Sequence, residues 1–173
     1  MMAFTQQRHR SFAPLDRPRE LIVACPPMRS NVNLSRIVRT AGCCGVGTLI
    51  ACGNAKIIDK IARNSIDDGD EDSPGVEIRI HRTLAPPLLE LKQQGYRLVG
   101  LEQTTGSENL HTYQFARRSV LVVGNERHGI DEEVLNLLND VVEIPVWGPP
   151  HAYNAATAAA MALYEYCRQW PSG

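Results

Sequence analysis

Two arginines near the start of the chain have the spacing of a phosphate-binding pair. They belong to the segment Asn31-Val-Asn33-Leu-Ser-Arg36-Ile-Val-Arg39-Thr-Ala-Gly42, which follows an apolar run of strand length. If the segment is helical, Arg36 and Arg39 share a face one turn in from its start, and Asn33 is placed to cap it. A phosphate at that end could meet both guanidinium groups and the free backbone N–H groups. A capped surface helix with two exposed arginines is the alternative.

A second candidate segment is a polar turn that follows another apolar run. It reads Val122-Val-Gly124-Asn125-Glu126-Arg127-His128-Gly129-Ile130. Ligands of open α/β sheets bind beyond the carboxyl ends of the strands, where this turn is expected, and Gly124 would let a ligand approach the backbone. The segment lacks the G-x-G-x-x-G pattern, so a flavodoxin-like or Rossmann enzyme with a phosphate-binding loop is not supported. An ordinary strand-to-helix turn is the alternative.

The third candidate segment is a loop shaped by three prolines and one glycine. It reads Ile144-Pro145-Val-Trp147-Gly148-Pro149-Pro150-His151-Ala152-Tyr153-Asn154. Proline restricts φ and glycine frees it, so this loop has a specific path and is neither a helix nor an inner strand. Its backbone groups could bind an adenine edge, while Asn154 caps the helix that follows.

A parallel sheet covered by helices is the scaffold that would position these segments. Apolar runs of strand length alternate with segments of helical period, which is typical of that α/β architecture. The expected strands are Leu21–Cys25, Thr48–Cys52, Val76–Ile80, Arg97–Leu101, Val120–Gly124 and Val141–Ile144. The expected helices are Asn33–Cys44, Leu84–Gln94, Asp131–Leu138 and Asn154–Gln169. Thr83 is expected to cap the second of these helices and Gly95 to end it, and Ala62–Gly75 is expected to be a surface loop.

Charge is distributed unevenly along the chain. The net charge of −1 argues against a protein that holds nucleic acid by bulk electrostatics. The first forty residues nevertheless carry seven arginines and only two acidic residues. The acidic residues that compensate lie elsewhere, notably Asp67, Asp68, Asp70, Glu71 and Asp72. The asymmetry fits a local phosphate-facing surface, and it equally fits a solvated basic tail with a solvated acidic loop.

Length and cysteine content suggest one domain in a reducing compartment. A chain of 173 residues is expected to form a single core, with residues 1–19 as a basic, flexible arm and residues 20–173 as the domain. We expect a cytoplasmic protein, because no signal peptide or membrane span is evident. The five cysteines include no C-x-x-C pair, so we expect reduced core thiols and no metal site.

Taken in order, the three segments resemble the signature motifs of the SPOUT methyltransferases, SpoU/TrmH branch. N-L-S-R-I-V-R-T-A-G, L-V-V-G-N-E-R-H-G-I and I-P-V-W-G-P-P-H-A-Y-N look like motifs one, two and three, and the resemblance spans residues 21–169. G-L-E-Q-T together with G-N-E-R looks closest to the catalytic domains that methylate a D-loop guanosine of tRNA. The resemblance implies a deep C-terminal trefoil knot, and methyl transfer from S-adenosylmethionine to a ribose 2′-hydroxyl of RNA, with tRNA favoured over rRNA.

The resemblance also implies the roles of individual residues. The cofactor would bind against Leu101, Gly124, Ile144 and Tyr153. Arg39 is the family's candidate for accepting the hydroxyl proton, but an arginine stays protonated in nearly all protein settings. We expect Arg39 to hold the phosphate, polarise the hydroxyl and reach the cofactor of the other subunit of a homodimer. The remaining catalytic residues would be Asn33, Glu126 and Asn154, which orient the site, and the RNA-binding residues would be Arg36, Arg39 and His151.

One position departs from the family pattern. Motif three usually reads Ser-Leu-Asn, whereas this chain has Ala152-Tyr153-Asn154. A lost hydrogen bond to a charged partner costs about 1.5–3 kcal/mol, which would slow an enzyme without abolishing its chemistry. His151 or the hydroxyl of Tyr153 could substitute for the serine. The alternative function is therefore a catalytically impaired knotted dimer that binds cofactor or RNA without methyl transfer.

Overall fold

The computed structural model describes residues 5–6, 13–66 and 75–173, of which 64–66 are described only in their backbone. Arg8, Arg10, the acidic residues between positions 67 and 72 and most of the expected loop Ala62–Gly75 lie outside the described residues. Within these described ranges, seven parallel strands form one sheet in the order β3-β2-β1-β6-β4-β7-β5. The strands are β1 (Leu21–Cys25), β2 (Thr48–Cys52), β3 (Glu77–His81), β4 (Arg97–Leu101), β5 (Glu108–Asn109), β6 (Ser119–Val123) and β7 (Asp140–Glu143).

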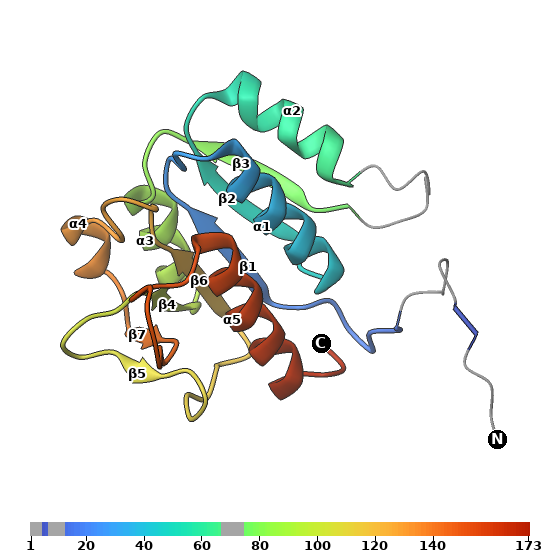
Figure 1. The fold of residues 1–173 in the computed structure, drawn as a ribbon. Helices are drawn as coiled ribbons and strands as arrows, with labels where there is room; N and C mark the ends of the chain where they lie inside the picture. The colour runs from blue at the N-terminus through green and yellow to red at the C-terminus, as the bar shows by residue number, and fades with distance from the viewer. Residues whose placement is uncertain (1–4, 7–12, 67–74) are drawn as a thin grey trace.

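Helices cover both faces of this sheet (Figure 1). On one face lie α1 (Asn31–Cys43), α2 (Ala55–Ile66) and α5 (Ala155–Gln169), and on the other α3 (Ala85–Gln93) and α4 (Glu132–Leu135). Alternate residues of β1 point to opposite faces of the sheet. Val23 packs in the hydrophobic core on the side of α1 and α5, and Ile22 packs in the core on the side of α3 and α4. Strands buried on both faces read as continuous apolar runs, which is why β1 and β6 are recognisable from sequence.

The structure confirms the parallel sheet and most of the expected elements. Strands β1, β2 and β4 have the predicted bounds, and β3, β6 and β7 differ by about one residue at their ends. Gly95 ends α3 with a φ of +87°, a conformation that favours glycine. The short strand β5 and the helix α2 were not predicted, and the loop expected from Ala62 begins inside α2.

The structure corrects two of the predicted helix caps and one helix length. Ser30, and not Asn33, caps α1: the backbone N–H of Asn33 donates to Ser30 Oγ at 3.3 Å. Thr83 does not cap α3, whose cap residue is Leu84 and makes no side-chain hydrogen bond. The helix expected over Asp131–Leu138 has only four residues, because tighter i to i+3 hydrogen bonds follow it at Leu137 and Leu138.

The described part of the N-terminal segment lies along the C-terminal end of α5. Asp16 donates its backbone N–H to the Ser172 carbonyl at 3.0 Å, and Arg17 Nε donates to the Gly173 carbonyl at 3.1 Å. Arg19 reaches the Cys44 and Trp170 carbonyls. These contacts place residues 16–19 against α1 and α5.

The structure also bears on the predictions about cysteines, membrane spans and metal sites. All five cysteines are unpaired; Cys25 and Cys52 are buried, but Cys43 is exposed, so the expectation of five core thiols is wrong at that position. Burial raises the pKa of the Cys25 thiol to about 12, which makes it unreactive. Within the described residues, no helix has the length and apolar character needed to cross a membrane, and no cluster of three or more His, Cys, Asp or Glu side chains is arranged to hold a metal.

Candidate functional site

A cleft of about 470 Å³ opens at the carboxyl edge of the sheet. Its walls come from the loops after β4, β6 and β7 and from the first turns of α5. Parallel strands place their carboxyl ends at one edge, so these loops meet although they are distant in sequence. The lining residues are Leu101, Glu102, Gln103, Val123, Gly124, Asn125, Glu126, Arg127, Gly129, Glu143, Ile144, Ala152, Tyr153, Asn154, Ala155 and Ala158.

The carboxylate of Glu126 ties the loop after β6 to the start of α1. It accepts hydrogen bonds from the backbone N–H groups of Arg29 at 2.9 Å and Ser30 at 3.1 Å, and from Asn33 Nδ2 at 2.8 Å. Partial burial disfavours the charged form, but these donors outweigh it, and the pKa of the Glu126 carboxyl lies below its usual value. A carboxylate that is ionised and held by three donors is a poor proton acceptor, so Glu126 positions its neighbours.

Asn33 extends this connection to α5. Its side chain is buried, with 6% of the residue exposed, and its Oδ1 accepts from Asn154 Nδ2 at 3.2 Å. Asn154 Oδ1 in turn accepts the backbone N–H groups of Ala156 at 3.0 Å and Thr157 at 3.4 Å, and so caps α5. Asn33 thus connects Glu126, in the second segment, to Asn154, in the third.

The turn after β6 is fixed by its own hydrogen bonds. Asn125 and Gly129 exchange two backbone hydrogen bonds of 2.9 Å, and Asn125 Nδ2 donates to the Pro27 carbonyl at 2.8 Å. A Cβ on Gly124 would come within 2.7 Å of Glu102 Oε2 and 3.2 Å of the Gly129 backbone. A side chain at position 124 would crowd Glu102 and the Gly129 backbone, so the packing of this turn favours glycine there.

The structure brings the four expected cofactor-binding residues together. Leu101, Gly124, Ile144 and Tyr153 all line the cleft, and Glu126 and Asn154 line it too. Ala152, at the position where the resembled motif has serine, also faces this space.

The expected RNA-binding residues do not share that cleft. Arg36 and Arg39 are exposed on α1, and neither lines this cleft or the pocket that adjoins it. His151 lines a second, adjoining pocket. The residue pair predicted to meet phosphate is therefore placed outside the cleft that would hold a cofactor.

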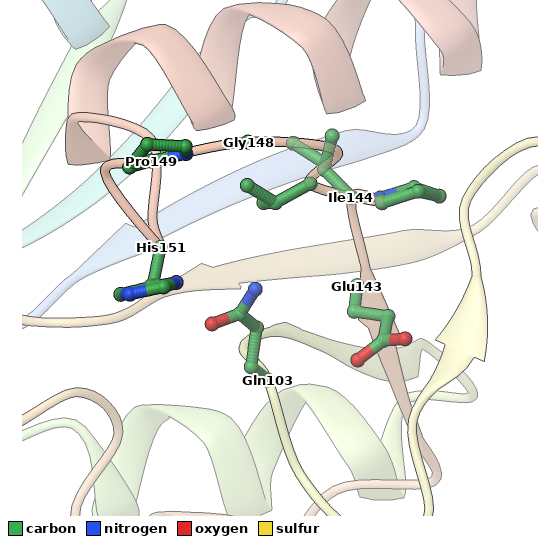
Figure 2. Close-up of a pocket in the computed structure, with 8 residues that line it drawn as sticks. Gln103, Glu143, Ile144, Gly148, Pro149 and His151 are labelled. Carbon is green, nitrogen blue, oxygen red and sulfur yellow. The ribbon is translucent and has the colours of Figure 1, made fainter.

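The second pocket has a volume of about 380 Å³ and lies under the proline-rich loop (Figure 2). Its polar side chains are Gln103, Glu143 and His151, and it shares Gln103, Glu143 and Ile144 with the main cleft. Ser107 Oγ donates to Glu143 Oε2 at 2.7 Å and fixes that carboxylate. The two cavities are thus neighbours with one common wall.

Sequence reasoning missed Glu102, Gln103 and Glu143. Glu102 and Gln103 follow β4, and Glu143 is the last residue of β7. The rule that ligands bind beyond the carboxyl ends of parallel strands points to the loop after β6, and it could have found these residues as well.

Comparison of sequences relates the chain to known methyltransferases. Residues 20–164 match the model of the SpoU rRNA Methylase family. A tRNA (guanosine(18)-2'-O)-methyltransferase of Aquifex aeolicus is 31% identical over 157 residues, which cover 88% of this chain and 71% of that protein. One of Mus musculus is 32% identical over 149 residues, but these cover only 9% of its length.

Comparison of structures gives the same relationship. The crystal structure of a TrmH/SpoU tRNA modifying enzyme from A. aeolicus has a TM-score of 0.76 at 30% identity, covering 90% of this chain and 77% of that one. The SpoU methyltransferase AviRb from Streptomyces viridochromogenes, in complex with the cofactor AdoMet, has a TM-score of 0.72 at 23% identity, covering 92% and 64%. The sheet and helices described above are thus shared with both.

Proposed function

The chain belongs to the SpoU rRNA Methylase family, and on this basis we propose that it is an RNA ribose 2′-O-methyltransferase that uses S-adenosylmethionine. The observation that carries the proposal is the meeting of Leu101, Gly124, Ile144 and Tyr153 in one cleft beside the Glu126–Asn33–Asn154 connection. Relatives named for methylation of guanosine 18 favour tRNA over rRNA as the substrate. Free cysteines fit a reducing compartment, which supports a cytoplasmic location.

The cleft fits S-adenosylmethionine in size and chemistry. Its volume of about 470 Å³ lies within the range of small-molecule sites. Leu101, Ile144 and Tyr153 would hold the adenosine, and the carboxylates of Glu102 and Glu143 complement a cofactor that carries positive charge. When bound, this cofactor supplies an electrophilic methyl group.

The residues of this chain would prepare the ribose hydroxyl for attack. A guanidinium stays protonated, so Arg39 would bind the neighbouring phosphate and stabilise charge on the 2′-oxygen by hydrogen bonding. Arg36 and His151 would add RNA contacts. Glu126, Asn33 and Asn154 would position the loops around the reacting atoms through the hydrogen bonds already described. None of these three needs to exchange a proton.

We propose that the active form is a homodimer in which Arg39 serves the cleft of the other subunit. Two observations support it: Arg39 does not line the cleft of its own chain, and α5 exposes Met161 and Tyr164. An exposed aromatic and a methionine on one helix suit a subunit contact.

A knotted C-terminal region is part of the same proposal. The sheet order places β6 between β1 and β4, with β7 beyond β4, and the loop over residues 144–154 shares the cleft with the ends of β4 and β6. A chain that returns from β7 through these neighbours to α5 would be threaded, which is a rare exception among chain paths.

The activity is tested by methyl transfer from radiolabelled S-adenosylmethionine to tRNA and rRNA. We expect the wild type to label a ribose 2′-hydroxyl of tRNA, and Arg39→Ala to lose about 100-fold or more of that activity while still binding cofactor. Absence of labelling by the wild type, with cofactor still bound, would favour the impaired binding dimer. Ala152 is the observation behind that alternative, and activity confined to Ala152→Ser would establish it.

The composite site is tested by mixing two inactive variants. Arg39→Ala lacks the cation, and Ala158→Leu places a bulkier side chain in the cleft. A mixed dimer would contain one intact site if Arg39 acts across the subunit boundary, so activity should reappear after mixing. No recovery, with mixed dimers demonstrated by mass, would mean that each subunit uses its own Arg39.

A further inference from the structure

The indole ring of Trp147 is exposed to solvent beside the second pocket. Trp147 is 80% exposed, although tryptophan is highly buried on average. Trp170, in contrast, is half-buried and donates its indole N–H to the Phe115 carbonyl at 3.1 Å. The exposure of Trp147 is thus a local feature that the packing of the fold does not explain.

The backbone of the loop that carries Trp147 is restricted. Val146 and Gly148, on either side of it, line the second pocket, and Pro145 and Pro149 restrict the backbone beside them (Figure 2). The imidazole of His111 lies 6.2 Å from the indole between ring centroids, with the planes tilted by 47°. A ring presented on a restrained loop loses little conformational entropy when it binds a partner.

The chemistry beside the ring is polar. Gln103, Glu143 and His151 line the pocket that Trp147 borders, and they offer an amide, a carboxylate and an imidazole. A nucleobase has two flat faces for stacking and a polar edge for hydrogen bonds, so it fits an indole next to such groups. An apolar protein side chain would make no hydrogen bonds to these groups and would exclude water from them, which costs free energy.

We propose that Trp147, flanked by His111, is a stacking platform for an unpaired base of the RNA, next to the nucleotide that enters the cleft. This inference rests on the proposed function, because the platform's pocket shares Gln103, Glu143 and Ile144 with the cleft. Bases in a duplex are stacked on each other, so the platform selects single-stranded or loop RNA. It also contributes affinity without neutralising a phosphate.

Two substitutions separate ring stacking from simple apolar contact. Trp147→Phe keeps an aromatic face, and Trp147→Leu keeps an apolar side chain without one. Binding of a fluorescein-labelled, mixed-sequence single-stranded 12-mer RNA should weaken about tenfold in Trp147→Leu and much less in Trp147→Phe. The slope of log affinity against log salt should be the same in both variants as in the wild type, and S-adenosylmethionine affinity should not change.

A control and a direct readout complete the test. Tyr96→Leu removes an aromatic ring at the opposite edge of the sheet and should leave RNA affinity unchanged. Indole emission should be quenched by the single-stranded RNA in the wild type, and that quenching should be absent in Trp147→Phe, which retains only Trp170. A duplex of the same sequence should quench weakly.

Three outcomes would overturn the platform. Equal RNA affinity of Trp147→Leu and the wild type would show that the ring does not stack on bases. A loss of dimer mass in Trp147→Leu would assign Trp147 to a subunit contact. A loss of cofactor affinity would assign it to the cleft. If the wild type binds no RNA at all, the proposed function itself fails, which is a distinguishable result.

Discussion

Carboxylates at the two edges of the sheet have different kinds of hydrogen-bond donors. At the amino edge, Asp140 is paired with Arg97 and accepts from the Tyr113 hydroxyl at 2.7 Å, and Glu20 is paired with Arg117 at 2.6 Å. At the carboxyl edge, the donors to Glu126 are two backbone N–H groups and an amide, all of them neutral.

This difference decides which arginines are available to a ligand. Among the described residues, Arg97, Arg117 and Arg118 form ion pairs at the amino edge, and no ion pair involves the exposed arginines of α1 and of the loops after β1 and β6. Those arginines are Arg29, Arg36, Arg39 and Arg127. Because neutral groups donate to Glu126, its charge is not paired with a guanidinium, and these arginines remain free to meet phosphate.

Glu126→Gln tests the carboxyl edge and should have the largest effect among the substitutions that compare the two edges. An amide offers one acceptor oxygen to three donors, so the loops after β1 and β6 should shift. A misplacement of about 1 Å can lower a reaction rate about 100-fold, so we expect a loss of that order in methyl transfer. The free energy of unfolding should fall by only about 1 kcal/mol, since the carboxylate is partly solvated. Unchanged activity would contradict the positioning role.

Asp140→Asn tests the amino edge and should show the reverse pattern. The side chain of Asp140 is 10% exposed, and its replacement weakens bonds to Arg97 and Tyr113. We expect a loss of about 2 kcal/mol in the free energy of unfolding, measured in urea, with cofactor affinity and activity retained. A large loss of activity in a folded protein would show that the two edges are not independent.

Low pH should remove the stabilisation that the carboxylates of Asp140 and Glu126 provide. Burial opposes ionisation at Asp140 and Glu126, but their donors outweigh it, so the pKa of each carboxyl is lowered in the folded state. Their stabilisation is therefore complete above the ordinary carboxyl range and is lost as pH falls below about 4 towards the folded pKa. Unfolding measured from pH 6 to pH 3 should show this decline. In a variant with both Glu126→Gln and Asp140→Asn, the free energy of unfolding should decline less steeply with falling pH. An identical slope would show that neither carboxylate contributes to the acid sensitivity.

Arg36→Ala should have the smallest effect and tests the unpaired arginines. Loss of one phosphate contact should reduce the slope of log affinity against log salt by about one and weaken tRNA binding less than about tenfold near 0.15 M salt. Arg63→Ala is the matched control, because Arg63 is exposed in the last turn of α2, away from the cleft. Equal slopes of log affinity against log salt in the two variants would show that Arg36 does not contact the RNA.

The strands and the edge that carries the site follow from the sequence alone. A strand buried on both faces must be apolar throughout, so β1 and β6 stand out as continuous apolar runs. Parallel strands end at one edge of a sheet, which places the turn that contains Gly124 at that edge, whereas the meeting of the four cofactor residues was expected only from the family resemblance.

The contacts between those segments required the tertiary structure. Whether Asn33 would cap its helix or bond to Glu126 depends on a residue 93 positions away, and Ser30 could serve as the cap equally well by local rules. The exposure of Trp147 and the position of Arg39 outside its own cleft are likewise evident only in the folded chain. Local preferences fix where an element starts and ends, whereas the partner of a polar side chain is set by which distant strands the sheet brings together.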